Sequence, residues 1–268
     1  MIDFGEKMIP FVGYIEPTLR CNHTCFYCYR EKAIPAEKDE LTRDEIKVVL
    51  DDMASLGTMI LVLTGGEIFL RPDIFDIIED ARKRAFAVVL FTNGSLTDEK
   101  AADKIKELAV TSVEITVRAA DAAKHDEITG MVGSFEKTVR AIRLLRERGV
   151  HVKMKYQVHQ ENISGSLIQD VQQYAKSLAV KAVCDSAIIP ARDGNMMGTS
   201  SALQGSELMS VLLSVSSIPK SFWDNPRSRL QDTTGQVCGA GMKTLTVSAQ
   251  GEVYPCVPMR FACGSIRK

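Results

Sequence analysis

Short runs of β-branched and other apolar residues alternate along this chain with longer stretches whose apolar positions recur at helical spacing. The short runs are bounded by glycine, proline and polar residues, which is typical of strands. They predict strands at Phe11–Thr18, Met59–Leu63, Ala87–Phe91, Ser112–Val117, Val150–Val158 and Ala182–Ile189. Strands that alternate with helices form βα units, and consecutive βα units build a parallel sheet.

Local signals predict where the helices begin. The Thr42 hydroxyl and Glu45 form a capping box before one helical run, and Pro72 is expected in the first turn of the next helix. Further helices are predicted from Asp98, over Ser134–Arg148, over Ser166–Leu178 and from Ser206. Six βα repeats without a seventh or eighth predict an α/β fold, a partial (βα)6 TIM-like barrel whose chemistry lies at the C-terminal ends of its strands.

The last part of the chain predicts a separate unit. Residues 218–236 are irregular and polar, so we expect a linker between a barrel of residues 1–217 and a small unit of residues 237–268. In that unit, strands are predicted at Thr244–Ser248 and Glu252–Tyr254, joined by a turn at Ala249-Gln250-Gly251. The unit is therefore expected to be a β-hairpin.

Charge and hydropathy exclude some classes of partner. The chain carries 33 Lys plus Arg against 34 Asp plus Glu, a net charge of −1, which predicts no nucleic-acid partner and no membrane-surface patch. No apolar run approaches the ~20 residues of a membrane span, and the N-terminus has no secretory signal, so a cytoplasmic location is expected. In that reducing compartment, the seven cysteines indicate metal ligands or reactive thiols rather than disulfides.

Three of these cysteines, Cys21, Cys25 and Cys28, follow the first predicted strand directly. Three thiolates so close in sequence can bind one corner of a cubane iron–sulfur cluster and leave one iron without a protein ligand. A small bidentate molecule could then bind the open iron. The alternative is a zinc site in which His23 completes a Cys3His set, although this spacing is unlike common zinc pairs.

The spacing Cys-x3-Cys-x2-Cys, with the aromatic Tyr27 before the last cysteine, resembles the signature loop of radical S-adenosylmethionine (radical SAM) enzymes. The resemblance implies a 4Fe–4S cluster on Cys21, Cys25 and Cys28, with the methionine group of S-adenosylmethionine bound at the fourth iron. It further implies one-electron reductive cleavage of that cofactor to a 5′-deoxyadenosyl radical, with a flavodoxin- or ferredoxin-type protein as the external reductant. The protein then holds the cofactor and shields the radical.

Two further motifs follow the next two predicted strands. Thr64-Gly65-Gly66-Glu67 resembles the family's Gly-Gly-Glu motif, which implies that Gly65, Gly66 and Glu67 bind the cofactor near its methionine ammonium. The missing side chains are expected to let the backbone approach that ligand closely. Thr92-Asn93-Gly94 resembles the family's Thr-Asn-Gly, which implies that Asn93 contacts the ribose.

The fourth strand departs from the family pattern. Where many relatives have Ser-x-Asp, this chain has Thr116-Val117-Arg118, so Thr116 is expected near the cofactor and Arg118 near an acidic substrate. By the alternation of side chains, Arg118 should point into the barrel mouth. Residues 125–135 resemble the segment before the fourth helix of peptide-modifying relatives, and on that helix Lys137 and Arg140 are candidates to pair the methionine carboxylate.

The C-terminal cysteines resemble the start of a SPASM or twitch domain, which carries auxiliary iron–sulfur clusters. The hairpin would bring Cys256 back to Cys238, and Cys263 is the next thiol available as a ligand, whereas Cys184 is expected in the core. Outside the first motif and Cys184, the chain supplies at most three cysteines, fewer than the four that a cubane usually takes. We therefore expect an auxiliary cluster that is weakly bound or missing, and a segment after Val237 that is poorly ordered or turned away from the barrel.

Three hypotheses of function follow. The first is a radical SAM enzyme that abstracts hydrogen from a ribosomal peptide during its maturation, with direct docking of the peptide or a separate recognition protein. The second keeps the radical chemistry but acts on a small molecule or tetrapyrrole side chain by oxidation or decarboxylation. The third, from another class, is a non-catalytic iron–sulfur carrier or scaffold.

Overall fold

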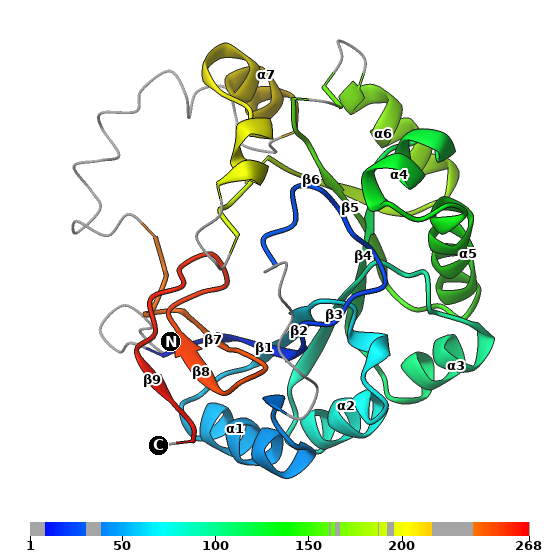
Figure 1. Ribbon diagram of the computed structural model, residues 1–268. Coiled ribbons are helices and arrows are strands. Elements are labelled where there is room, and N and C mark those ends of the chain that lie inside the picture. Colours follow the sequence, from blue (N-terminus) through cyan, green and yellow to red (C-terminus); the bar gives the residue numbers. More distant parts are fainter. Residues whose placement is uncertain are drawn as a thin grey trace, which may run out of the picture.

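The computed structural model describes residues 9–30, 39–160, 162–163, 167–186, 188–191, 196–215 and 238–267. Within them, strands and helices alternate as predicted (Figure 1). The strands are β1 (Val12–Thr18), β2 (Ile60–Gly65), β3 (Ala87–Thr92), β4 (Ser112–Val117), β5 (Val152–Gln157), β6 (Lys181–Asp185), β7 (Thr244–Val247), β8 (Glu252–Tyr254) and β9 (Gly264–Ser265). The helices are α1 (Arg43–Ser55), η2 (Ile68–Leu70), α2 (Ile74–Lys83), α3 (Glu99–Glu107), α4 (Ala122–Thr129), α5 (Ser134–Glu147), α6 (Leu167–Ser177), η3 (Met197–Ser201) and α7 (Gly205–Val215).

The strands form one open sheet in the order β6-β5-β4-β3-β2-β1-β7-β8-β9. Strands β1 to β6 are all parallel, and helices lie around the outside of their curved arc (Figure 1). The expectation of a partial barrel made of six βα units is therefore confirmed. Because all six strands run in one direction, their carboxyl ends meet at the same mouth.

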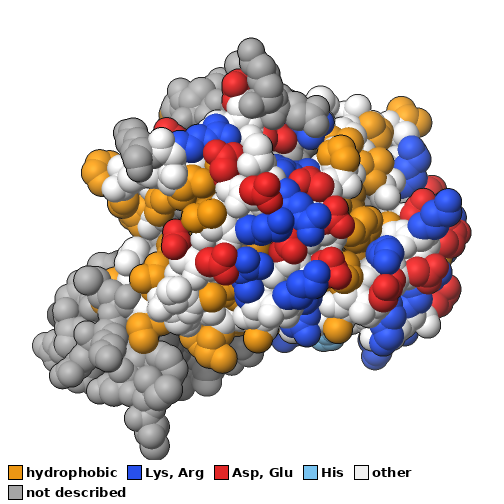
Figure 2. All heavy atoms as spheres, turned by 90° about the horizontal axis from the view of Figure 1, so that it is seen from below, with side chains coloured by type: hydrophobic (Ala, Val, Ile, Leu, Met, Phe, Trp, Pro, Cys, Tyr) orange, Lys and Arg blue, Asp and Glu red, His pale blue; other side chains and the backbone are white. Residues whose placement is uncertain are grey.

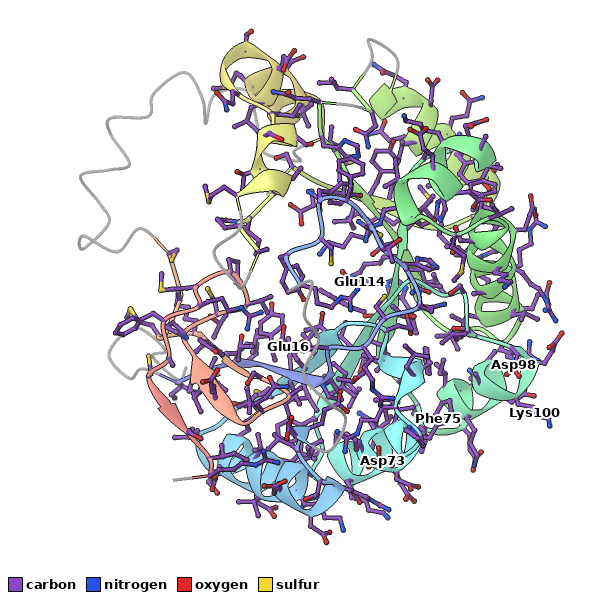
Figure 3. All side chains as sticks on the ribbon, viewed as in Figure 1. Glu16, Asp73, Phe75, Asp98, Lys100 and Glu114 are labelled. Atoms are coloured by element: carbon purple, nitrogen blue, oxygen red, sulfur yellow. The ribbon has the colours of Figure 1, made fainter. Side chains whose placement is uncertain are left out.

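Side-chain alternation separates a packed layer from a polar interior. On β4, Val113, Ile115 and Val117 are fully buried in the core beneath the helices. The residues between them therefore face the inside of the barrel. Figure 3 shows Glu16 and Glu114 inside the ring of helices, whereas Asp98 and Lys100 lie on its outside.

Most helix signals act as predicted. At α1, the Thr42 hydroxyl accepts from the Glu45 N–H at 3.2 Å, and the Glu45 carboxylate accepts from the Thr42 N–H at 2.7 Å. The prediction that Pro72 lies in the first turn of α2 is wrong, because that helix begins at Ile74 after the cap Asp73. Asp73 does not cap with its side chain, since its carboxylate binds the Arg71 guanidinium at 2.7 and 3.1 Å.

One helix was not predicted as such. Residues of the segment that resembles peptide-modifying relatives form α4, where the Asp121 carboxylate accepts from the Lys124 N–H at 2.8 Å. The helix ends at Gly130, whose φ of +66° favours glycine. Its short length and weak apolar pattern hide it from periodicity arguments.

The C-terminal segment is joined to the barrel. Strand β7 pairs in parallel with β1, with Val12 opposite Thr244 and Ile15 opposite Val247, and β8 and β9 extend the sheet. The expectation of a poorly ordered or turned-away segment is therefore wrong for residues 238–267. The physical reason is that β1 would otherwise present an open edge of unpaired backbone groups. The predicted linker at residues 218–236 lies outside the described residues.

The outer face over α1 and α2 mixes basic and acidic side chains (Figure 2). Arg43 binds Asp80 at 2.7 Å and Arg84 binds Asp51 at 2.6 Å, so several of these charges are paired. No helix in the described part of the chain is both long and apolar enough to cross a membrane.

Candidate active site

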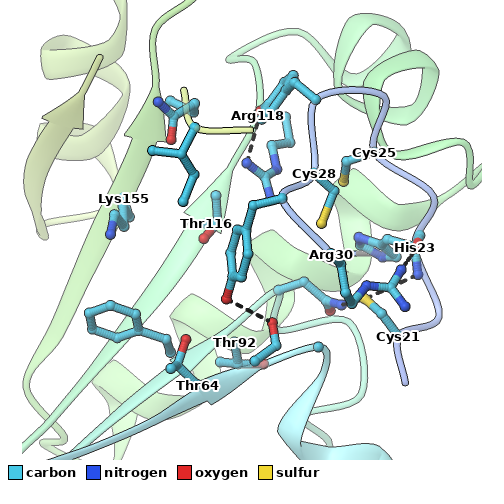
Figure 4. A pocket seen from close by; sticks show the side chains of 18 of the residues that line it. Cys21, His23, Cys25, Cys28, Arg30, Thr64, Thr92, Thr116, Arg118 and Lys155 are labelled. Atoms are coloured by element: carbon cyan, nitrogen blue, oxygen red, sulfur yellow. Dashed lines mark hydrogen bonds between the residues drawn. The ribbon is translucent and has the colours of Figure 1, made fainter. Parts of the chain in front are cut away.

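A cavity of about 180 Å³ opens at the carboxyl ends of the barrel strands (Figure 4). Five successive strand ends contribute to it, together with the loop that carries the three cysteines. The lining residues are Cys21, His23, Cys25, Tyr27, Cys28, Tyr29, Arg30, Thr64, Gly65, Gly66, Phe91, Thr92, Asn93, Thr116, Arg118, Lys155, Gln157, Ile188 and Ile189.

The cysteine loop has no regular secondary structure and is held by bonds to other segments. The Thr24 N–H donates to the Thr129 carbonyl at 2.8 Å, which attaches the middle of the loop to the end of α4. The Arg30 guanidinium donates to the carbonyls of Leu19 at 2.8 Å and His23 at 3.2 Å, which brings the start and end of the loop together. The loop is therefore fixed by partners distant in sequence.

The three cysteines of the loop are free and half-buried, and all three line the cavity. Burial raises the pKa of the Cys21 and Cys25 thiols above the ordinary value. Thiols of this kind are protonated near neutral pH, so metal binding to them releases protons. Three soft ligands on one side of an open cavity suit an iron–sulfur cluster.

The structure offers less for a zinc site. His23 is buried with its Nε2 atom unpartnered among the described residues, and burial followed by the charge of Arg118 lowers the pKa of His23 to about 4. In the described part of the chain, no three His, Cys, Asp or Glu side chains converge as the ligands of one ion would. Ligands of a cluster bind separate irons and stand further apart, so this arrangement favours a cluster over zinc.

The glycine pair lies where β2 passes the exit of β1. A Cβ atom on Gly66 would lie 2.0 Å from the Arg20 carbonyl oxygen, and one on Gly65 would lie 2.6 Å from the Thr18 carbonyl oxygen. The Gly66 N–H donates to that Thr18 carbonyl at 2.9 Å. Both glycines line the cavity, as expected. In this structure, the close approach that leaves no room for a Cβ atom is to the backbone leading into the cysteine loop, and the close approach to a bound ligand stays a prediction.

The Glu67 side chain accepts hydrogen bonds from residues at the end of the next strand, β3. Its fully buried carboxylate accepts from the Thr92 hydroxyl at 2.7 Å, the Asn93 N–H at 2.8 Å and the Phe69 N–H at 3.2 Å. Burial raises the pKa of the Glu67 carboxyl, and these bonds oppose that shift. Glu67 is not among the residues that line the cavity, so its geometry is that of a positioning residue for the Thr92–Asn93 turn.

Asn93 lines the cavity and also contacts the cysteine loop. Its Nδ2 atom donates to the Asn22 side-chain oxygen at 2.9 Å and lies 3.8 Å from the Cys21 sulfur. Its Oδ1 atom accepts from the Ser95 N–H and hydroxyl at 2.8 and 2.7 Å. The third strand end is therefore oriented by its own turn and bonded to the loop.

Comparison with known proteins agrees with this geometry. The model of a family described as the Radical SAM superfamily matches residues 15–161, which run from within β1 through the cysteine loop to the end of β5. The chain belongs to the radical SAM superfamily. Members are enzymes that use a 4Fe–4S cluster and S-adenosylmethionine, so the expectation of these two cofactors is confirmed.

Individual relatives have different named functions. An AdoMet-dependent heme synthase of Methanosarcina barkeri is 32% identical over 67% of this chain and 51% of its own length. The Bacillus subtilis antilisterial bacteriocin subtilosin biosynthesis protein AlbA is 28% identical over 98% of this chain and 58% of its own length. The chain thus spans about half the length of the curated relatives it matches.

A solved structure shows the same fold. Streptococcus suis SuiB bound to its precursor peptide SuiA superposes with a TM-score of 0.69 at 11% identity, over 94% of this chain and 60% of that one.

Arg118 meets Tyr27 of the cysteine loop at the wall of the cavity. The Arg118 guanidinium donates to the Tyr27 hydroxyl at 2.8 Å and lies 5.1 Å from the centre of its ring. Burial alone would lower the pKa of Arg118, but Tyr27, Cys25 and Cys28 outweigh it and raise the pKa. Arg118 therefore faces the cavity, as predicted from its parity, but its charge is directed at the cysteine loop.

Thr116 lines the cavity, but two other predicted site residues do not. Lys137 and Arg140 are exposed on α5, and Arg140 pairs with Glu99 on α3. The structure does not bring either cation to the cavity, because their helix packs on the outer side of the sheet (Figure 1).

Residues from β5 also line the cavity and were not predicted. Lys155 and Gln157 reach it because they alternate with the buried Met154 and Tyr156. The Lys155 Nζ atom lies 4.6 Å from the centre of the Phe91 ring. The alternating polar positions of this strand were the signal that could have identified them.

The C-terminal cysteines lie in the segments before and after the strands of the hairpin. Cys238 and Cys263 are exposed and Cys256 is half-buried, and all three are free thiols. The Gly241 N–H donates to the Pro255 carbonyl at 3.0 Å, so the hairpin brings the segments of Cys238 and Cys256 together as expected. Cys184 packs against the core from β6.

Proposed function

We propose that this chain carries the catalytic barrel of a radical SAM enzyme that abstracts hydrogen from a peptide substrate. One observation carries the proposal: the three cysteines, the glycine pair, Asn93 and the cations of β4 and β5 line one cavity. The match to AlbA along nearly the whole chain supports a role in peptide maturation. The likeness to SuiB supports the fold on which such a role depends.

The residues present suit the family's cofactors. Cys21, Cys25 and Cys28 would hold the cluster. The strand ends at Gly65, Gly66, Asn93 and Thr116 would hold S-adenosylmethionine, and Tyr27 of the loop lines the same cavity. When bound, these groups supply a carbon radical that removes a hydrogen atom from the substrate. The chain's own residues orient both partners and exclude water from the cavity.

The lining of the cavity suits a carboxylate. Among the described residues that line the cavity, none has a carboxylate side chain, whereas Arg30, Arg118 and Lys155 are cations. Lys155 lies 3.6 Å from Asp185, which would balance its charge in the absence of substrate. An acidic side chain or a C-terminal carboxylate of the peptide would pair with these cations.

A second candidate is a tetrapyrrole side chain. The 32% identity to the heme synthase supports it, and so does the cationic lining, because the propionate groups of tetrapyrroles are carboxylates. A flavodoxin- or ferredoxin-type reductant and, for a peptide, a separate recognition protein remain proposed partners.

Cofactor cleavage is the first test. The full chain is reconstituted anaerobically with iron and sulfide and supplied with dithionite and S-adenosylmethionine, and 5′-deoxyadenosine is measured by chromatography. Replacing Cys21, Cys25 and Cys28 with alanine should abolish the product. Release at the parent rate from the triple variant would refute the proposal, and no release from the parent would favour an iron–sulfur carrier.

Two probes then distinguish the substrate classes. A set of short acidic peptides and Fe-coproporphyrin III are incubated with the reconstituted chain, and products are analysed by mass spectrometry. Loss of hydrogen from a peptide supports the first candidate, and loss of carbon dioxide from the porphyrin supports the second. Deuterium transfer from the labelled probe to 5′-deoxyadenosine identifies the hydrogen donor.

We also propose that Cys238, Cys256 and Cys263 bind an auxiliary cluster. Where these three cysteines leave the cluster without a fourth ligand, we expect weak binding. Iron analysis of the reconstituted chain tests this. About four irons per chain, lost in the Cys21/Cys25/Cys28 variant, would indicate no stable second cluster. A value near eight, half of it retained in that variant, would establish one.

A further inference from the structure

A buried carboxylate on β1 is paired with an arginine from the other end of the chain. Glu16 is fully buried, and Figure 3 shows it inside the ring of helices. Arg260 donates to its two carboxylate oxygens at 2.8 and 3.1 Å. This bidentate geometry is the strongest form of an arginine–carboxylate contact and fixes the orientation of both groups.

The same arginine contacts the residue that follows the last cysteine of the loop. The Arg260 guanidinium lies 5.0 Å from the centre of the Tyr254 ring and 5.7 Å from that of the Tyr29 ring. The Tyr29 hydroxyl lies 3.5 Å from the Glu16 carboxylate and 3.4 Å from the Gly65 carbonyl. One network therefore joins the C-terminal segment, β1, the cysteine loop and the glycine motif.

A second arginine of the C-terminal segment provides a contrast. Arg267 binds Glu45 on α1 at 2.7 and 3.0 Å and donates to the carbonyls of Asp39 and Glu40. It holds the same segment to the barrel, but at the outer surface. None of its described contacts involves the cysteine loop. Arg267 therefore attaches the C-terminal segment without contacting the cysteine loop, whereas Arg260 also contacts Tyr29. A comparison of the two arginines can separate the effect of attachment from the effect of contact with the loop.

We infer that Arg260 is a positioning residue for the cysteine loop, so that the C-terminal segment sets the position of Cys28 through Tyr29. The inference rests on the proposed role of the three cysteines as cluster ligands. Cys28 directly precedes Tyr29, so contacts that fix the Tyr29 side chain restrain the main chain from which the Cys28 thiol projects. Because linkage is reciprocal, binding at the cysteine loop also stabilises the docked segment.

Hydrogen–deuterium exchange of the cluster-free full chain tests the inference without any cofactor. Arg260→Ala should accelerate exchange several-fold in peptides covering residues 21–30, whereas Arg267→Ala should leave them at the parent rate. Arg260→Lys should retain only part of the parent's protection from exchange, because a lysine keeps the charge but not the bidentate geometry. Equal loop exchange in Arg260→Ala and Arg267→Ala would overturn the inference.

A double variant is the control if Arg260→Ala increases exchange throughout the barrel. Glu16→Gln combined with Arg260→Gln removes both charges and leaves no unpaired buried carboxylate. If the barrel is then protected while residues 21–30 exchange fast, the positioning role stands. If the loop is also protected, the ion pair serves stability alone and the inference fails.

Spectroscopy of the reconstituted chain provides a second measurement. The change that S-adenosylmethionine makes in the electron paramagnetic resonance spectrum of the reduced cluster should be altered in Arg260→Lys and unaltered in Arg267→Ala. Failure of the parent chain to assemble a cluster would refute the proposed function. The exchange experiment would still decide on Arg260, so the two failures are distinguishable.

Discussion

Replacing Gly66 with alanine should displace the start of the cysteine loop. The new Cβ would lie 2.0 Å from the Arg20 carbonyl oxygen and 2.7 Å from the Leu19 carbonyl carbon. The shortest ordinary carbon–oxygen contact is about 3.3 Å, so one backbone must move by roughly 1.3 Å. Neither neighbour is the end of a flexible side chain, and relief must therefore come from the main chain.

The displaced backbone leads directly to a cysteine. The Glu67 N–H donates to the same Arg20 carbonyl at 2.8 Å, so the movement weakens this bond and shifts Cys21. Overpacking of this kind typically costs about 1–3 kcal/mol, which for a chain of this size lowers Tm by roughly 2–12 °C. A displacement near 1 Å at a reacting site costs on the order of 10²-fold in rate.

Three measurements on Gly66→Ala check this reasoning: Tm, iron retained after reconstitution, and the rate of 5′-deoxyadenosine release. Gly264→Ala is the matched control, because its Cβ would meet no heavy atom within 4 Å and its backbone needs no glycine. Parent values for all three in Gly66→Ala would refute the argument. A slower rate with unchanged Tm and iron would instead show that the glycine serves the cofactor directly.

Three further perturbations test other contacts. Glu67→Gln should destabilise the fold by about 1–3 kcal/mol and weaken binding of S-adenosylmethionine. The reason is that an amide cannot accept from both the Thr92 hydroxyl and the Asn93 N–H, as the carboxylate does. An unchanged Tm would contradict this. Arg118→Ala should reduce substrate conversion more than uncoupled cofactor cleavage, and equal loss of both would assign Arg118 to the cofactor. The hydrogen bond from Arg267 is the main cause that lowers the pKa of Glu45 to about 2, from 4.5 in the unfolded chain. The pair therefore stabilises the fold fully at pH values above 4.5, and this stabilisation is lost as the pH falls toward 2. The stability difference between parent and Arg267→Gln, at most about 1 kcal/mol for such an exposed pair, should therefore be larger at pH 6 than at about pH 3, and a pH-independent difference would exclude the linkage.

Much of the barrel could be predicted because its signals are local. The apolar runs of the six strands, the capping box at Thr42 and the cysteine spacing each lie within a few residues, and the structure follows them. The parity of Arg118 also predicted that it faces the cavity. Its direction within the cavity was not predictable, because that depends on the Tyr27 hydroxyl, far away in sequence.

Pairings across the whole chain escaped prediction for the same reason. The parallel register of Val12 with Thr244 and the ion pair of Glu16 with Arg260 join opposite ends of the sequence. Nothing near Glu16 indicates that a carboxylate in an apolar strand will find a cation. The glycine pair lines the cavity, as its motif predicted, but the close approach of Gly66 to the Arg20 backbone becomes visible only when two strand ends are packed together.

The cysteine loop needs such distant partners because it forms no hydrogen-bond ladder of its own. Next to Cys21, the Arg20 carbonyl accepts from the Glu67 N–H at the end of β2. Next to Cys25, the Thr24 N–H donates to the Thr129 carbonyl at the end of α4. Each of these two cysteines is thus adjacent to a residue fixed by a different element of the barrel.

Tyr29, next to Cys28, completes the pattern through its contact with Arg260 of the C-terminal segment. The residues next to the three cysteines therefore contact three elements that are separate in sequence: the end of β2, the end of α4 and the docked hairpin. A cluster held by all three cysteines, as we propose, would depend on every one of these contacts at once. The cysteine spacing predicts which atoms bind iron, and the surrounding fold determines where those atoms lie.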